Sequence, residues 1–159
     1  SCMNKDSPVI AWTPGADRAV AETILRALPD WFGIEEALVG YVEAASAMPT
    51  ATAWLGNQAV GFASMGQATS AASDVHVIGV LPDYHDQGIG RMLIRALAVR
   101  AKTDGARFLT VKTLSSAHPD PFYGRTRRFY EAVGFAPLAE LPEHWGPENP
   151  CLLMGKALA

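Results

Sequence analysis

Residues 80–91 read VLPDYHDQGIGR, and this stretch decides the fold. A β-rich run over 74–80 leads into it, and an amphipathic helix is predicted to leave it from about residue 88 to residue 103. The first amide groups of a helix lack carbonyl partners and lie at the positive end of the helix dipole, so they bind anions. Because Gly88 and Gly90 have no side chains to keep a phosphate away, the stretch predicts a phosphate site. A tight helix entry, in which the glycines serve only the turn, is the alternative.

The same stretch excludes two common kinds of nucleotide site. No Gly-Lys-Ser/Thr follows the glycines, so it is not a P-loop. The third glycine of a dinucleotide-binding fingerprint would fall at Leu93, so that motif fails as well. The predicted anion site is therefore of another kind.

The rest of the chain switches between hydrophobic periods of about two and about 3.6, which is typical of a mixed α/β fold. The helix 88–103 lies between two predicted strands, which implies a parallel strand pair. Loops are expected over 67–73 and 141–150. The sequence predicts strands over 9–13, 52–55, 59–65, 74–80, 108–114 and 151–154, and helices over 16–28, 34–48, 88–103 and 126–133.

The composition of the chain fits one domain over residues 1–159, with residues 1–7 expected to be a flexible N-terminus or an expression scar. Hydrophobic residues make up 49% and charged residues 18%, which excludes a disordered chain. No apolar run reaches the roughly 20 residues that a membrane helix needs. The net charge of −3 argues against nucleic acid as a partner. Cys2 and Cys151 are expected to be reduced thiols, the expected location is cytoplasmic, and no metal site is expected.

A second motif lies further along the chain, where residues 129–135 read FYEAVGF. Together with the pattern V-x-P-x-x-H-x-x-G-x-G over 80–90, it resembles the GNAT superfamily of acyl-CoA-dependent N-acyltransferases. The resemblance covers about residues 8–158. It implies a central mixed, mostly antiparallel sheet flanked by helices, in which the strands 74–81 and 108–114 splay apart to admit the pantetheine of acetyl-CoA. His85 and Tyr123 depart from the family pattern, which usually has Arg or Gln at the first position and often Asn at the second.

The resemblance also implies acetyl-CoA as the cofactor and assigns residues to it. Backbone groups of the strand would pair with pantetheine, and backbone amides of the following loop would hold the pyrophosphate. The residues implied for cofactor binding are Ile78, Gly79, Val80, His85, Asp86, Gln87, Gly88, Ile89, Gly90 and Arg91. Tyr130 looks like the family tyrosine that protonates the departing thiolate, since a phenol has an ordinary pKa of about 10. A simple helix anchor is the alternative for Tyr130.

A general base is needed because an ammonium group must lose a proton before it attacks a thioester. Alternate residues of a strand share one face, so Asp74, His76, Ile78 and Val80 are predicted to lie on one side. Asp74 matches a position where some relatives carry a catalytic Glu. An imidazole accepts a proton near neutral pH, which favours His76. Asp74, His76 and a water molecule therefore stay open as the base.

The acceptor is expected to be a primary amine of a small molecule or a peptide. Aromatic side chains in loops suit a cationic amine, and those selected are Trp31, Phe32, Tyr123 and Trp145. The predicted function is acetyl transfer from acetyl-CoA to this amine by direct attack in a ternary complex. A CoA-binding module without turnover is the alternative, and a homodimer is left open. Acetylation of aminoacyl-tRNA is disfavoured by the acidic balance of the chain.

Overall fold

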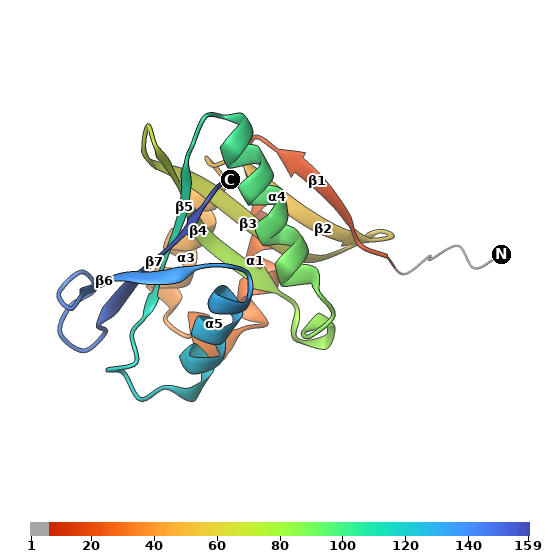
Figure 1. Cartoon of the computed structure of the whole chain (residues 1–159). Helices are drawn as coiled ribbons and strands as arrows, with labels where there is room; N and C mark the ends of the chain where they lie inside the picture. The colour runs from red at the N-terminus through yellow and green to blue at the C-terminus, as the bar shows by residue number, and fades with distance from the viewer. Residues whose placement is uncertain (1–6) are drawn as a thin grey trace. The chain divides into compact units, whose positions relative to one another are not determined.

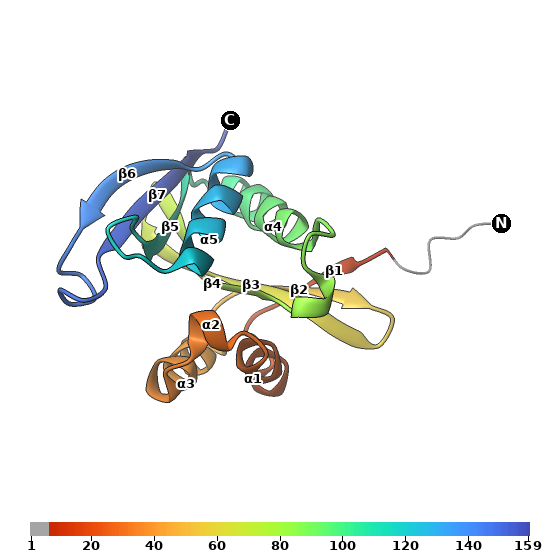
Figure 2. The ribbon, with the colours of Figure 1, turned by 90° about the horizontal axis from the view of Figure 1, so that it is seen from below.

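The structure is a computed structural model, and it describes residues 7–159. Cys2 and nearly all of the N-terminal segment 1–7 lie outside the described residues. The helices and strands, labelled in Figure 1 except for α2, which is labelled in Figure 2, are β1 (Val9–Thr13), α1 (Arg18–Arg26), α2 (Pro29–Phe32), α3 (Glu35–Ala45), β2 (Thr50–Leu55), β3 (Gln58–Thr69), β4 (Ala72–Val80), α4 (Ile89–Thr103), β5 (Phe108–Leu114), α5 (Pro121–Ala132), β6 (Ala136–Leu141) and β7 (Cys151–Ala157). A short 3-10 helix, Pro82–Tyr84, lies between β4 and α4.

The strands form a mixed sheet in the order β1-β2-β3-β4-β5-β7-β6. The pairs β1–β2, β2–β3, β5–β7 and β6–β7 are antiparallel, and β4–β5 is parallel. This confirms the predicted fold class and the predicted parallel pair. The β4–β5 register runs from Ala72 opposite Phe108 to Val75 opposite Val111, and β4 then continues to Val80.

The described chain divides into two compact units. The first contains the residues up to Gly66 together with His76–Val99, and the second contains Gln67–Val75 and Arg100–Ala159. Each unit has buried apolar residues of its own.

In the first unit, α1, α2 and α3 lie on one face of the strands and α4 lies on the other (Figure 2). The face toward α1 and α3 is a continuous apolar cluster that includes Ile24, Leu25 and Leu38, with Phe62 and Val77 from the strands. Gly79 of β4 allows α1 to pack closely, because a Cβ at this position would come within 3.1–3.3 Å of Ile24, Leu28 and Leu25. The strand that leads into the predicted phosphate site is therefore fixed against α1.

In the second unit, β5 pairs along its whole length with β7, and β7 pairs with β6. Asp120 is the N-cap of helix α5, and its side chain accepts a hydrogen bond of 2.9 Å from the Phe122 amide. The helix ends where Lys156 Nζ donates to the carbonyl oxygen of Val133 at 2.8 Å. These two contacts mark the ends of α5, and Tyr130 lies in the last turn of the helix.

Three local predictions were wrong. Residues 67–73 are not a loop but the ends of β3 and β4 around a turn at Ser70 and Ala71. The carbonyl oxygen of Ala71 accepts bonds from the amides of Arg107 and Phe108, so pairing with a distant segment overrides a polar local sequence. Helix α5 starts before residue 126 because Pro121 stands at its first position, where proline favours a helix. Strand β6 was missed because its residues are mostly exposed and show no alternating pattern.

Candidate active site

The predicted phosphate loop connects the end of β4 to the start of α4. Asp86 and Gly88 both have positive φ angles, of 60° and 81°. Gly88 is suited to this conformation, and a Cβ at its position would meet nothing within 4 Å. The loop is therefore open on the side of Gly88, and the backbone rather than packing selects glycine there.

The start of α4 supplies unpaired amide groups to this loop. The Met92 amide donates to the carbonyl oxygen of Gly88 at 3.0 Å, which is the first bond of the helical ladder. The amides of Ile89, Gly90 and Arg91 precede that bond and so have no partner within the helix. Because Ile89 is buried, the helix start is held in place. An open, glycine-lined loop at the N-terminus of a helix of this length fits a phosphate anion.

His85 and Gln87 shape this loop through contacts inside it. The His85 Nε2 atom donates to the carbonyl oxygen of Val80 at 2.7 Å, and the His85 amide donates to the carbonyl oxygen of Pro82 at 3.2 Å. Gln87 Nε2 donates to the carbonyl oxygen of Asp83 at 3.1 Å. The His85 side chain therefore stabilises the turn, and the amides toward α4 remain the candidates for an anion.

The burial of β4 alternates along the strand as the sequence predicts. Asp74, His76, Ile78 and Val80 are half-buried, and the residues between them are buried. In the second unit, the Thr110 hydroxyl donates to Oδ1 of Asp74 at 2.6 Å. This bond orients the Asp74 carboxylate from the neighbouring strand.

His76, in the first unit, belongs to a cluster of rings that sequence reasoning did not find. Its ring centroid lies 5.6 Å from that of Tyr41 on α3, and Phe32 of α2 lies edge-on to Tyr41 at 5.5 Å. Trp31, the neighbour of Phe32, lies edge-on to His85 at 6.2 Å. Of the predicted acceptor residues, Phe32 is thus linked to the predicted base His76 through Tyr41, and Trp31 contacts His85 of the predicted phosphate loop.

Tyr41 was missed because it lies at helical spacing with Leu38 and Ala45, which are core positions. An aromatic residue in such a row is normally a packing residue. Its half-buried state distinguishes it, since Leu38 and Ala45 are fully buried. That difference in exposure is a property of the tertiary structure and carries no signal in the sequence.

The other predicted site residues lie in the second unit. Tyr130 is buried, and its ring contacts Phe129 at 5.4 Å and Phe135 at 5.5 Å. Tyr123 is half-buried in the first turns of α5. Trp145 is 38% exposed in the loop after β6, where its ring lies beside His144.

The Cys151 thiol of β7 is free and buried. Burial raises its pKa, so the reactive thiolate is disfavoured, which is consistent with a structural thiol. Among residues 7–159, no cluster of three or more His, Cys, Asp or Glu side chains could hold a metal ion. In the same described part of the chain, no helix is long and apolar enough to cross a membrane.

The fold thus combines a mixed sheet that contains a parallel β4–β5 pair with an open, glycine-lined loop at the start of α4. The family model for the acetyltransferase (GNAT) domain matches residues 49–137, which is more than half of the chain. The chain therefore belongs to the GNAT acetyltransferase family. No curated protein matches the chain.

Several solved structures share the fold. A putative GNAT acetyltransferase from Desulfovibrio desulfuricans is 21% identical, with 95% of this chain and 100% of that chain covered and a TM-score of 0.79. An aminoglycoside 6'-N-acetyltransferase in complex with coenzyme A is 18% identical, with 95% and 97% covered and a TM-score of 0.74. A GNAT acetyltransferase from Elizabethkingia anophelis with acetyl-CoA bound is 17% identical, with 96% and 99% covered and a TM-score of 0.73. At these identities the likeness shows the fold.

Proposed function

We propose that this chain is a single-domain, acetyl-CoA-dependent N-acetyltransferase that acts on a primary amine of a small molecule or a peptide. The observation that carries the proposal is the open loop at Gly88, where the backbone of a GNAT family member presents the unpaired amides of α4. Support comes from two structural neighbours that hold coenzyme A or acetyl-CoA, one of them an aminoglycoside N-acetyltransferase. Acetyl-CoA, when bound, supplies the acetyl group as a thioester.

Backbone groups of this chain would hold acetyl-CoA. The amides from Asp86 to Arg91 would bind the pyrophosphate, with His85 shaping the loop. The β4–β5 register ends at Val75, so the backbone groups of Ile78, Gly79 and Val80 that point away from β3 lie beyond that ladder. In the proposal they pair with the pantetheine arm as a strand would. An acidic chain can therefore hold an anionic cofactor, because the contacts come from backbone amides.

Two proton transfers are proposed. The acceptor amine must lose a proton, which His76, Asp74 or an ordered water takes up. On the leaving side, the Tyr130 phenol donates a proton to the departing thiolate sulfur. The amine attacks directly within a ternary complex, so no side chain of this chain carries the acetyl group.

The proposal is tested first by calorimetry with acetyl-CoA and CoA, and then by a thiol-release assay with a panel of primary amines. We expect micromolar to millimolar binding of both nucleotides and steady turnover with at least one amine. Absence of binding at millimolar concentration contradicts the proposal. Binding without any turnover identifies the chain as a CoA-binding module instead.

The role of Tyr130 is tested by Tyr130→Phe in the same assay. The variant keeps the ring contacts with Phe129 and Phe135, so the fold is expected to remain. Loss of the proton donor is expected to lower kcat about tenfold to hundredfold with little change in CoA affinity. An unchanged kcat would leave Tyr130 as a helix anchor only.

A further inference from the structure

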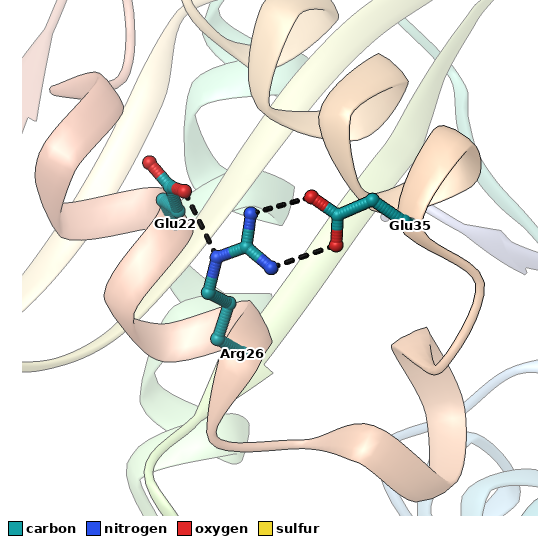
Figure 3. A network of polar contacts seen from close by, with 3 residues as sticks. All are labelled: Glu22, Arg26 and Glu35. Atoms are coloured by element: carbon teal, nitrogen blue, oxygen red, sulfur yellow. Dashed lines mark hydrogen bonds and ion pairs between the residues drawn. The ribbon is translucent and has the colours of Figure 1, made fainter.

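Arg26, the last residue of α1, is held by two carboxylates (Figure 3). Its Nε atom donates to Glu22 at 2.9 Å, one turn earlier on the same helix. Its two terminal nitrogens donate to the two carboxylate oxygens of Glu35 at 2.8 Å each. Glu35 is the first residue of α3, so this paired contact joins the end of α1 to the start of α3.

Between Arg26 and Glu35 the chain forms the short helix α2, in which Trp31 and Phe32 pack against the apolar cluster of the first unit. Its four residues, Pro29–Phe32, are exposed or half-buried, and Leu28 at its N-cap provides no side-chain cap. The amides of Trp31 and Phe32 both donate to the carbonyl oxygen of Leu28, at 3.1 and 2.9 Å. A helix this short gains little from its own hydrogen bonds. Its position therefore depends on the packing of Trp31 and Phe32 against the apolar cluster and on what holds the chain at its two ends.

The two aromatic residues of α2 are the ones that reach the candidate site of the first unit. Phe32 lies against Tyr41, which in turn contacts His76, and Trp31 lies against His85. A shift of α2 would move both rings relative to His76 and the phosphate loop. The position of α2 therefore sets the geometry that these two rings present to a ligand.

We propose that Arg26 is a positioning residue that fixes α2 through Glu35 and thereby sets how Trp31 and Phe32 recognise the acceptor amine. This inference rests on the proposed function. A guanidinium that donates two parallel bonds to one carboxylate fixes both the distance and the orientation of the two chain segments. All three side chains are exposed, so the ion pair adds little to global stability, and its effect is on local geometry.

The chain contains a matched control for this contact. Arg18 and Glu43 form a second ion pair between α1 and α3, also with exposed side chains. Arg18 is the first residue of α1, and Glu43 lies near the end of α3, so this pair joins the same helices away from α2. Glu35→Gln and Glu43→Gln each remove one charge from one α1–α3 ion pair, but only Glu35→Gln releases an end of α2.

The first measurement is hydrogen exchange of the peptide 28–34 in the absence of substrate. We expect Glu35→Gln to speed exchange in this peptide about threefold to fivefold, and Glu43→Gln to leave it at the wild-type rate. Arg26→Lys keeps the charge but cannot make the two parallel bonds, so it should behave like Glu35→Gln. Equal exchange in Glu35→Gln and Glu43→Gln, or wild-type exchange in Arg26→Lys, would overturn the inference.

The second measurement is steady-state kinetics with an amine that the wild-type chain acetylates. Glu35→Gln should raise the KM for the amine about threefold to fivefold, with the KM for acetyl-CoA and the melting temperature near wild type. Equal rises in both KM values, or a rise in Glu43→Gln, would indicate a general structural effect and overturn the positioning role. If the wild-type chain acetylates no amine, the proposed function and the acceptor role of α2 fail together, and the exchange result still decides whether Arg26 fixes α2.

Discussion

The phosphate loop after β4 and the helical corner formed by α1, α2 and α3 contribute to the same unit in different ways. The loop offers backbone amides, and its side chains, such as His85 and Gln87, serve the turn itself. The corner offers side chains, in which Phe32 contacts Tyr41 and Tyr41 contacts His76. A site built from backbone amides restricts which residues can stand in the loop. A site built from aromatic side chains can instead be altered by replacing one residue at a time. In the proposed enzyme, the loop binds a part of acetyl-CoA that never changes, and the corner meets the acceptor.

Among the substitutions that test this contrast, the largest effect on activity is expected at His76. His76→Gln should lower kcat about a hundredfold and remove the limb of the pH–rate profile that belongs to the base, since an imidazole is the ordinary proton acceptor near neutral pH. Asp74→Asn serves as the comparison and should retain that limb. Loss of the limb in Asp74→Asn alone would assign the base to Asp74, and its survival in both variants would assign the step to water.

A smaller effect is expected from a side chain at Gly88. Gly88→Val places a branched residue at a φ of 81° and fills the open side of the loop, so CoA affinity in calorimetry should fall at least about tenfold.

Gly56, in the turn between β2 and β3, is the matched control for Gly88. It also has a positive φ, of 57°, with nothing within 4 Å of a Cβ. Gly56→Val should therefore lose similar stability and keep its CoA affinity. Equal affinities in the two variants would contradict a backbone-built phosphate site.

Replacing a ring of the helical corner is expected to have a moderate effect. Tyr41→Leu removes the contacts with Phe32 and His76, so the KM for the amine should rise about threefold to tenfold while CoA affinity stays unchanged. The free energy of unfolding should fall by about 1–2 kcal/mol, measured by urea denaturation. A loss of CoA affinity instead of amine affinity would show that the corner and the loop are not separate in function.

The smallest expected effect is a pH dependence of stability at Glu35. Hydrogen bonds from Arg26 hold the pKa of Glu35 below its ordinary value of 4.5, so the ionised state is the one favoured by folding. The stabilisation is thus complete above pH 4.5 and is lost as the pH falls through the lower pKa of the folded state. The melting temperature of wild type should exceed that of Glu35→Gln by at most about 2 °C at pH 6. This difference should shrink in acid, and a difference that grows as the pH falls would contradict the ion pair.

The loop could be predicted from the sequence because its proposed function depends on glycine residues, which can be recognised directly in the sequence. Gly88 and Gly90 after a β-rich run predict a helix start with free amides, and the structure places α4 from Ile89 onward. The family motif at 129–135 likewise falls at the end of α5, where Gly134 adopts a φ of 102°.

The corner could not be predicted in the same way. Tyr41 has the spacing of a core residue, and only the fold shows that it touches His76. Arg26 and Glu35 are ordinary surface charges in the sequence, and their pairing depends on the path of α2 between them. Strand β6 gave no alternating pattern because both of its faces are largely exposed. Each of these features depends on contacts between residues that no helical or strand periodicity in the sequence connects.

Gly79 allows β4 to pack closely against α1, which fixes the position of the strand in the first unit. Ile24, Leu25 and Leu28 pack against the backbone of β4 at Gly79, so a side chain at this position would push them away from the strand. Evolution or design could therefore exchange the segment 27–34 for one of another sequence while Arg26 and Glu35 retain its ends. Strand β4 would keep its place through such an exchange. In the proposed enzyme, new acceptor preferences could therefore be acquired without rebuilding the residues that are proposed to bind acetyl-CoA.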